Sequence, residues 1–122
     1  MTAEALSTYT LTVGEVAAAA GVATSAVRFY EQHGVVHAER TSGDQRRFDD
    51  SAACRIRVAK VAQRVGLTVR EIAGIFDELP RDPQPADWGR VAETLIREAE
   101  ERTAALRAHL DAMRSGSRLC EL

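Results

Sequence analysis

The chain has 122 residues, of which 45% are hydrophobic and 28% charged, and its formal net charge is −2 at pH 7. These values are typical of one globular domain with at most one appended element, and they exclude a disordered chain. Because the net charge is negative, any binding of nucleic acid must come from a local arrangement of basic residues. No apolar run approaches the roughly 18 residues that cross a bilayer, and no secretory signal is visible, so we expect a cytoplasmic protein that spans no membrane.

The first part of the chain has the pattern of two short helices joined by a tight turn. Apolar residues recur at three- and four-residue steps over 13–20 and predict a helix that ends at Gly21. Thr24 or Ser25 can cap the second helix. The pair fits a helix-turn-helix, because Ala17 lies four residues before the glycine, where a small side chain lets the helices cross closely. An ordinary corner between two helices would leave a similar pattern.

The middle of the chain changes from helical to extended character and back. A turn cluster at 41–44 divides the segment 35–49 into two short extended pieces and predicts a small β-hairpin. A third helix is expected behind a capping segment at Asp49, Asp50 and Ser51. Thr68 opens a fourth helix, and Glu71 three residues later completes a capping box.

The C-terminal part is predicted to be one long helix, from about 87 to 114, behind a spacer stiffened by Pro80, Pro83 and Pro85. At 1.5 Å per residue this helix would be roughly 40 Å long, too long to bury against so small a domain. One heptad frame places an uncharged seam along it, which predicts homodimerisation through a coiled coil. The alternative is that the helix folds back onto helices three and four. The seam residues are Ala92, Ile96, Ala99, Thr103, Leu106, Leu110 and Met113.

Polar residues on the second helix and on the hairpin suggest contacts to DNA. Short hydroxyls and one arginine at a helix N-terminus suit phosphates and base edges in a major groove. An arginine pair after a hairpin turn can straddle a phosphate run, although beside aspartates it could equally form weak surface ion pairs. The candidate contacts are Thr24, Ser25, Arg28, Gln45, Arg46 and Arg47.

Several of these segments together resemble the MerR family of transcription regulators. They are LTVGEVA at 11–17, VRFYE at 27–31 and RTSGDQRRF at 40–48, followed by KVAQRVG at 60–66. The form of the third segment is nearer to the SoxR-like redox regulators than to the metal sensors. The resemblance extends over about residues 10–113.

The resemblance implies a mainly α fold with three parts. A winged helix-turn-helix DNA-binding domain would occupy 10–80, an antiparallel coiled-coil dimerisation helix 86–114, and a C-terminal tail 115–122. Such a homodimer would bind a palindromic promoter and distort it for RNA polymerase. The residues it assigns to DNA are Thr24, Ser25 and Arg28 on the recognition helix, Tyr30 at its boundary with a phosphate, and Gln45, Arg46 and Arg47 on the wing. We expect no enzyme; a module that pairs with a related regulator and titrates it stays open as an alternative.

The C-terminus departs from the SoxR-like pattern. Those regulators hold a [2Fe–2S] cluster with four closely spaced cysteines, whereas this chain has Cys120 there and Cys54 elsewhere. We therefore expect no such cofactor, because four thiolates are usually required. Cys120 remains a candidate redox thiol, and a bridge from Cys54 to Cys120 between protomers stays open. His33, His37 and His109 are scattered, so no metal site is expected.

Overall fold

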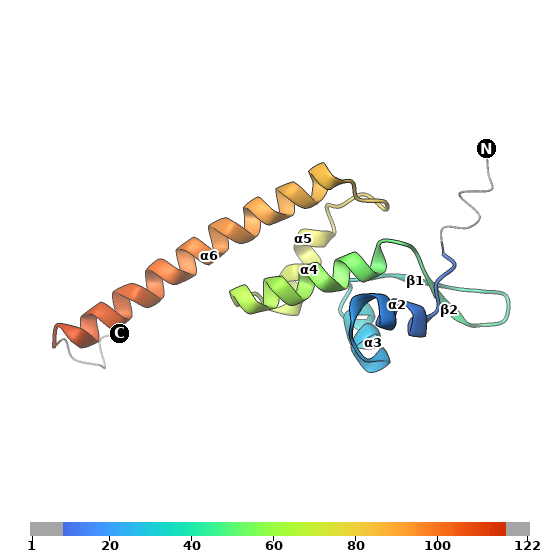
Figure 1. Cartoon of the computed structure of the whole chain (residues 1–122), viewed down its shortest axis with the longest axis horizontal. Helices are drawn as coiled ribbons and strands as arrows, with labels where there is room; N and C mark the ends of the chain where they lie inside the picture. The colour runs from blue at the N-terminus through green and yellow to red at the C-terminus, as the bar shows by residue number, and fades with distance from the viewer. Residues whose placement is uncertain (1–8, 117–122) are drawn as a thin grey trace.

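The computed structural model describes residues 9–116, which form helices and one small hairpin. The elements are α2 (Val13–Ala20), α3 (Thr24–Gln32), β1 (Ala38–Arg40), β2 (Arg46–Phe48), α4 (Ala52–Val65), α5 (Val69–Phe76) and α6 (Pro85–Arg114). Figure 1 shows α2, α3 and the hairpin at one end, α4 and α5 in the middle, and α6 as a long arm. The predicted mainly α fold, with a two-stranded wing and a long C-terminal helix, is confirmed. Among the helices within 9–116, none is long and apolar enough to cross a bilayer.

The helix-turn-helix is shaped by the two ends of α2. At its start, Thr12 Oγ1 accepts a hydrogen bond from the Glu15 amide at 3.1 Å, and the Glu15 carboxylate accepts one from the Thr12 amide at 2.8 Å. At its end, Gly21 has φ of 72°, in the left-handed region where a residue with a Cβ is strained. The turn into α3 therefore depends on glycine at this position.

Two helix boundaries differ from the prediction. The N-cap of α3 is Ala23, whose backbone is extended, so Thr24 and Ser25 lie inside the first turn and neither of them caps the helix. The last helix begins at Pro85, earlier than expected, because proline fits the first helical position, where its missing N–H has no partner to lose.

The wing is an antiparallel hairpin anchored to the start of the helix-turn-helix. Glu39 stands opposite Arg47 in the register of β1 and β2. Phe48 is fully buried, and its backbone pairs with Leu11 through hydrogen bonds of 2.7 and 2.9 Å. This anchor fixes the base of the wing beside α2.

One continuous hydrophobic core joins the helix-turn-helix, the hairpin, α4, α5 and the start of α6. α4 contacts α2, α5 and α6, and therefore lies at the centre of the fold. The largest fully buried side chains of the core are Val16, Val27, Val35, Val36, Phe48, Ile56 and Ile72.

α6 has two parts with different surroundings. Near its start, Val91 and Leu95 are buried in the core, and Trp88 packs edge-on against Phe76. Farther along, Arg102 Nη1 donates to the Gly66 carbonyl at 3.1 Å. Beyond that point the helix projects away from the rest of the molecule (Figure 1), and residues 100–111 are all exposed. The first part of α6 therefore packs against the core, as expected if the helix folds back onto the preceding helices. Only the second part of α6, beyond Arg102, projects free of the core.

Candidate DNA-binding surface

A groove of about 330 Å³ lies between the helix-turn-helix and the wing. Arg28 reaches it from α3, and Arg40, Arg46 and Arg47 reach it from the hairpin, whereas Asp44 is its one carboxylate. Arg40 Nη1 lies 3.1 Å from Asp44 Oδ1 across the hairpin turn. Arginine forks suit phosphates and guanine edges, so this surface has the chemistry of a polyanion site. The lining residues are Thr12, Val13, Arg28, Arg40, Asp44, Gln45, Arg46 and Arg47.

Neighbouring acceptors hold the wing arginines in place. Arg46 Nε lies 2.9 Å from Glu31 Oε1 of α3. Arg47 donates to Gln45 Oε1 at 3.0 Å and to the carbonyl of Arg46 at 3.1 Å. Exposed pairs of this kind add little to stability. Their consequence is orientation, since they hold charged side chains at the edge of the groove.

The pKa of one carboxylate near the groove lies below its usual value. Hydrogen bonding to the backbone and side chain of Thr12 lowers the pKa of Glu15, and the charge of Arg47 lowers it further. The negative charge of Glu15 in the capping box therefore interacts with the positive charge of Arg47 on the wing.

The N-terminal turn of α3 is open to solvent beside the groove. Thr24, Ser25 and Arg28 are all exposed. Because no side chain caps this helix, the amides of Thr24 and Ser25 remain available to a ligand. The positive end of the helix dipole adds to the attraction of an anion there.

Tyr30 lies behind this surface and faces the core. Its side chain is 6% exposed, and its hydroxyl donates to Gln63 Oε1 of α4 at 2.6 Å. Burial raises the pKa of the Tyr30 phenol. The hydrogen bond joins α3 to α4 and fixes how the recognition helix sits on the core.

The groove brings together four of the seven residues predicted to contact DNA: Arg28, Gln45, Arg46 and Arg47. Thr24 and Ser25 lie on the adjoining turn of α3, and Tyr30 lies beneath it. Thr12 and Arg40 line the groove but were not among the predicted contacts. The Thr-x-x-Glu capping pattern marks Thr12 in the sequence, although only the fold places it beside the wing.

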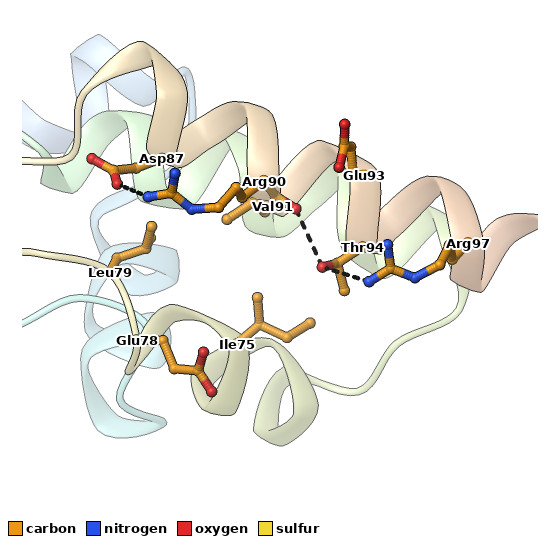
Figure 2. Close-up of a pocket in the computed structure, with 9 residues that line it drawn as sticks. All are labelled: Ile75, Glu78, Leu79, Asp87, Arg90, Val91, Glu93, Thr94 and Arg97. Atoms are coloured by element: carbon orange, nitrogen blue, oxygen red, sulfur yellow. Dashed lines mark hydrogen bonds and ion pairs between the residues drawn. The ribbon is translucent and has the colours of Figure 1, made fainter.

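A second cleft, also of about 330 Å³, lies between α5 and the start of α6 (Figure 2). Ile75, Leu79 and Val91 form its apolar part. Acidic and basic side chains alternate around them, and Arg90 is paired with Asp87. This mixture of charges does not single out an anionic or a cationic ligand, which distinguishes the cleft from the arginine-lined groove.

Comparisons with known proteins agree with this geometry. Residues 11–79 match the family described as MerR HTH family regulatory protein, and residues 54–115 match the family described as MerR, DNA binding. The chain belongs to the MerR family. It is therefore a MerR-type DNA-binding transcriptional regulator and not an enzyme.

Individual MerR relatives cover most of the chain. An HTH-type transcriptional activator SoxR homolog of Chromobacterium violaceum is 36% identical over 107 residues, which are 84% of this chain and 72% of the relative. A mercuric resistance operon regulatory protein of Pseudomonas fluorescens is 32% identical over 86% of this chain and 72% of its own. The crystal structure of HiNmlR, a MerR family regulator lacking the sensor domain and bound to promoter DNA, superposes with a TM-score of 0.54. That match, at 20% identity over 86% of this chain and 85% of the other, shows a shared fold.

The described residues do not supply the ligands of an iron–sulfur cluster. Between residues 9 and 116 the single cysteine is Cys54, an exposed free thiol on α4, whereas a [2Fe–2S] cluster usually takes four thiolates. Cys120 and the proposed bridge to Cys54 lie outside the described residues. Within the same range, no group of three or more His, Cys, Asp or Glu side chains is placed to hold a metal ion.

Proposed function

We propose that this MerR-family chain regulates transcription as a homodimer bound to a palindromic promoter, which it distorts for RNA polymerase. The observation that carries the proposal is the shared groove, where Arg28 of α3 and three arginines of the wing converge. A chain with a net charge of −2 that brings four guanidiniums together in one groove is suited to local contact with a polyanion. A module that only titrates a partner has no need of such a groove.

In this proposal the contacts divide between sequence reading and positioning. Thr24, Ser25 and Arg28 enter a major groove and contact base edges and phosphates. The wing residues Arg46 and Arg47, with Gln45, grip the neighbouring phosphate run. Tyr30 acts from within the core by holding α3 against α4.

The exposed seam of α6 supports the dimeric part of the proposal. Ile96, Leu106, Leu110 and Met113 are between 50% and 59% exposed in the single chain. Apolar side chains repeated at heptad spacing on a projecting helix call for a partner helix. Two copies of the chain would place two identical reading surfaces on one DNA duplex, and the matching site would be a palindrome.

The salt dependence of DNA binding tests the assigned contacts. Arg28→Ala and Arg47→Ala should each weaken binding and reduce the slope of log K against log salt by about one phosphate contact, because each removes one guanidinium from the backbone of the duplex. The measurement is a fluorescence anisotropy titration at several salt concentrations, on a duplex that the purified protein has captured from genomic DNA.

Arg97→Ala is the matched control, since Arg97 is an exposed arginine that lines the cleft between α5 and α6 instead of the wing groove. It should keep the wild-type slope. Wild-type slopes for Arg28→Ala and Arg47→Ala would refute their assignment to phosphates.

A further inference from the structure

The free part of α6 presents an uncovered apolar stripe. Leu106 is 59% exposed, Leu110 54% and Met113 50%. Their spacing places them on one side of the helix, and on a water-soluble surface such a stripe is normally covered by another helix. The charged residues beside the stripe determine which helix can pair with it and in which alignment.

The protein's own domain occupies one edge of the stripe. In the heptad frame the a positions are Ile96, Thr103 and Leu110, and the d positions are Ala92, Ala99, Leu106 and Met113. The g edge turns toward the domain, because Leu95 is buried in the core and Arg102 bonds the Gly66 carbonyl. A partner helix must therefore lie along the seam and the opposite, e edge.

The e edge carries an ordered set of charges. Its residues are Glu93 and Glu100 in the first half of the helix, and Arg107 and Arg114 in the second half. All four are exposed. Among residues 9–116, the first three make no ion pair, and Arg114 pairs only with Asp111 one turn away, at 2.8 Å, with 82% of its side chain exposed. Glu93 lies at the rim of the cleft between α5 and α6, and in Figure 2 its carboxylate points away from Ile75 and Leu79.

For the antiparallel coiled coil that the MerR resemblance implies, we infer that the two copies of α6 pair in one particular register. In antiparallel coils e positions face e positions, and such charges set orientation and partner choice. The register that uses all of them places Glu93 against Arg114 of the second copy and Glu100 against Arg107 of the second copy. The two-fold axis then repeats both pairs, which gives four ion pairs between the protomers.

The apolar seam fits the same register. It stacks Ile96 on Met113, Ala99 on Leu110 and Thr103 on Leu106 of the second copy. Two of these layers combine a small residue with a large one, as close packing of two helices favours. The two-fold axis passes between the levels of Ala104 and Ala105. The packing of the seam is therefore compatible with the alignment that the charges favour.

The competing alignments bring like charges together. Moving the antiparallel pair by one heptad places Glu100 against Glu100 in one direction and Arg107 against Arg107 in the other, and it leaves two ion pairs instead of four. A parallel pair would place g positions against e positions, so Arg102, which already bonds its own domain, would have to face Arg107 of the second copy. Like-charged neighbours on paired helices are unfavourable, so both alternatives are disfavoured.

The register matters for DNA because it sets the separation of the two reading surfaces. A shift of one heptad moves the two-fold axis along each helix by about 5 Å, and so changes the distance between the domains by about 10 Å. That distance corresponds to about three base pairs between half-sites. This inference rests on the proposed homodimer and adds the register in which its two helices pair.

A charge-exchange experiment tests the register. One variant carries Glu93→Lys with Glu100→Lys, and the other carries Arg107→Glu with Arg114→Glu. In the homodimer of either variant, all four e contacts bring like charges together. The dissociation constant of that homodimer should therefore be at least about tenfold higher than that of the wild-type dimer. An equimolar mixture should form the heterodimer with wild-type affinity, as measured by native mass spectrometry and analytical ultracentrifugation.

Glu101→Lys is the matched control, because Glu101 is exposed and adjacent to Glu100 but lies at the outer f position. It should dimerise like the wild type. Recovery of the dimer on mixing also shows that both variants fold. Variants that each dimerise as tightly as the wild type, or a mixture that fails to form the heterodimer, would overturn the register while leaving a homodimer standing. A monomeric wild-type protein would instead refute the homodimer itself.

Discussion

At the scale of single residues, the reading surface depends on neighbouring side chains that hold its contact residues in position. Glu31 holds Arg46, Gln45 holds Arg47, and Gln63 holds Tyr30. These partners were not predicted, because the last pair joins residues 33 positions apart and sequence patterns do not show long-range hydrogen bonds. The arginines themselves could be predicted, since charged side chains after a turn remain exposed whatever their exact partners.

Tyr30→Phe separates a positioning role from direct contact with DNA. The substitution removes the hydrogen bond to Gln63, so the free energy of unfolding should fall by about 1 kcal/mol in urea titrations. DNA affinity at a fixed salt concentration should stay close to that of the wild-type protein, because Tyr30 is buried and its hydroxyl bonds Gln63. A marked loss of affinity with unchanged stability would instead make Tyr30 a DNA ligand.

At the scale of elements, local signals predicted the helices and the hairpin well. The capping box at Thr68, the turn glycine at Gly21 and the turn cluster before β2 each encode a boundary within a few residues. Two helix starts were predicted wrongly. α3 has Ala23 as its N-cap, which has no side-chain acceptor, and α6 begins at Pro85, which was expected to end the spacer. In both places a backbone conformation decides the boundary, and several residue types are compatible with it.

Two glycines give a matched test of the helix-turn-helix turn. An added Cβ would meet no atom within 4 Å at either Gly21 or Gly74, but only Gly21 has a positive φ, of 72°. Gly21→Ala should therefore lower the free energy of unfolding by about 1–2 kcal/mol through backbone strain alone. Gly74→Ala, inside α5, should raise it by about 0.5–1 kcal/mol. Thermal and urea unfolding measure both, and a stabilising Gly21→Ala would show that the turn tolerates an ordinary residue.

At the scale of the whole molecule, the fold separates the proposed DNA-binding groove from the proposed dimerisation seam. Figure 1 shows α3 and the wing at one end of the molecule and α6 projecting from the other. The groove lies between α3 and the wing, and the exposed apolar seam lies on α6. The core connects them through α4, which contacts both α2 and α6. The sequence alone predicted a seam but not this division, because the burial of Val91 and Leu95 depends on how α6 packs against the finished core.

A footprint on captured DNA tests the central claim most directly, that two copies read one palindrome. Genomic fragments bound by the purified protein are enriched, and the best fragment is footprinted with the wild-type chain and with a Leu106→Glu, Leu110→Glu variant. We predict two protected half-sites related by two-fold symmetry, between promoter elements set too far apart, and loss of protection in the variant because charges in the seam separate the protomers. Protection of a single half-site that survives the double substitution, or no enriched fragment at all, would contradict the account.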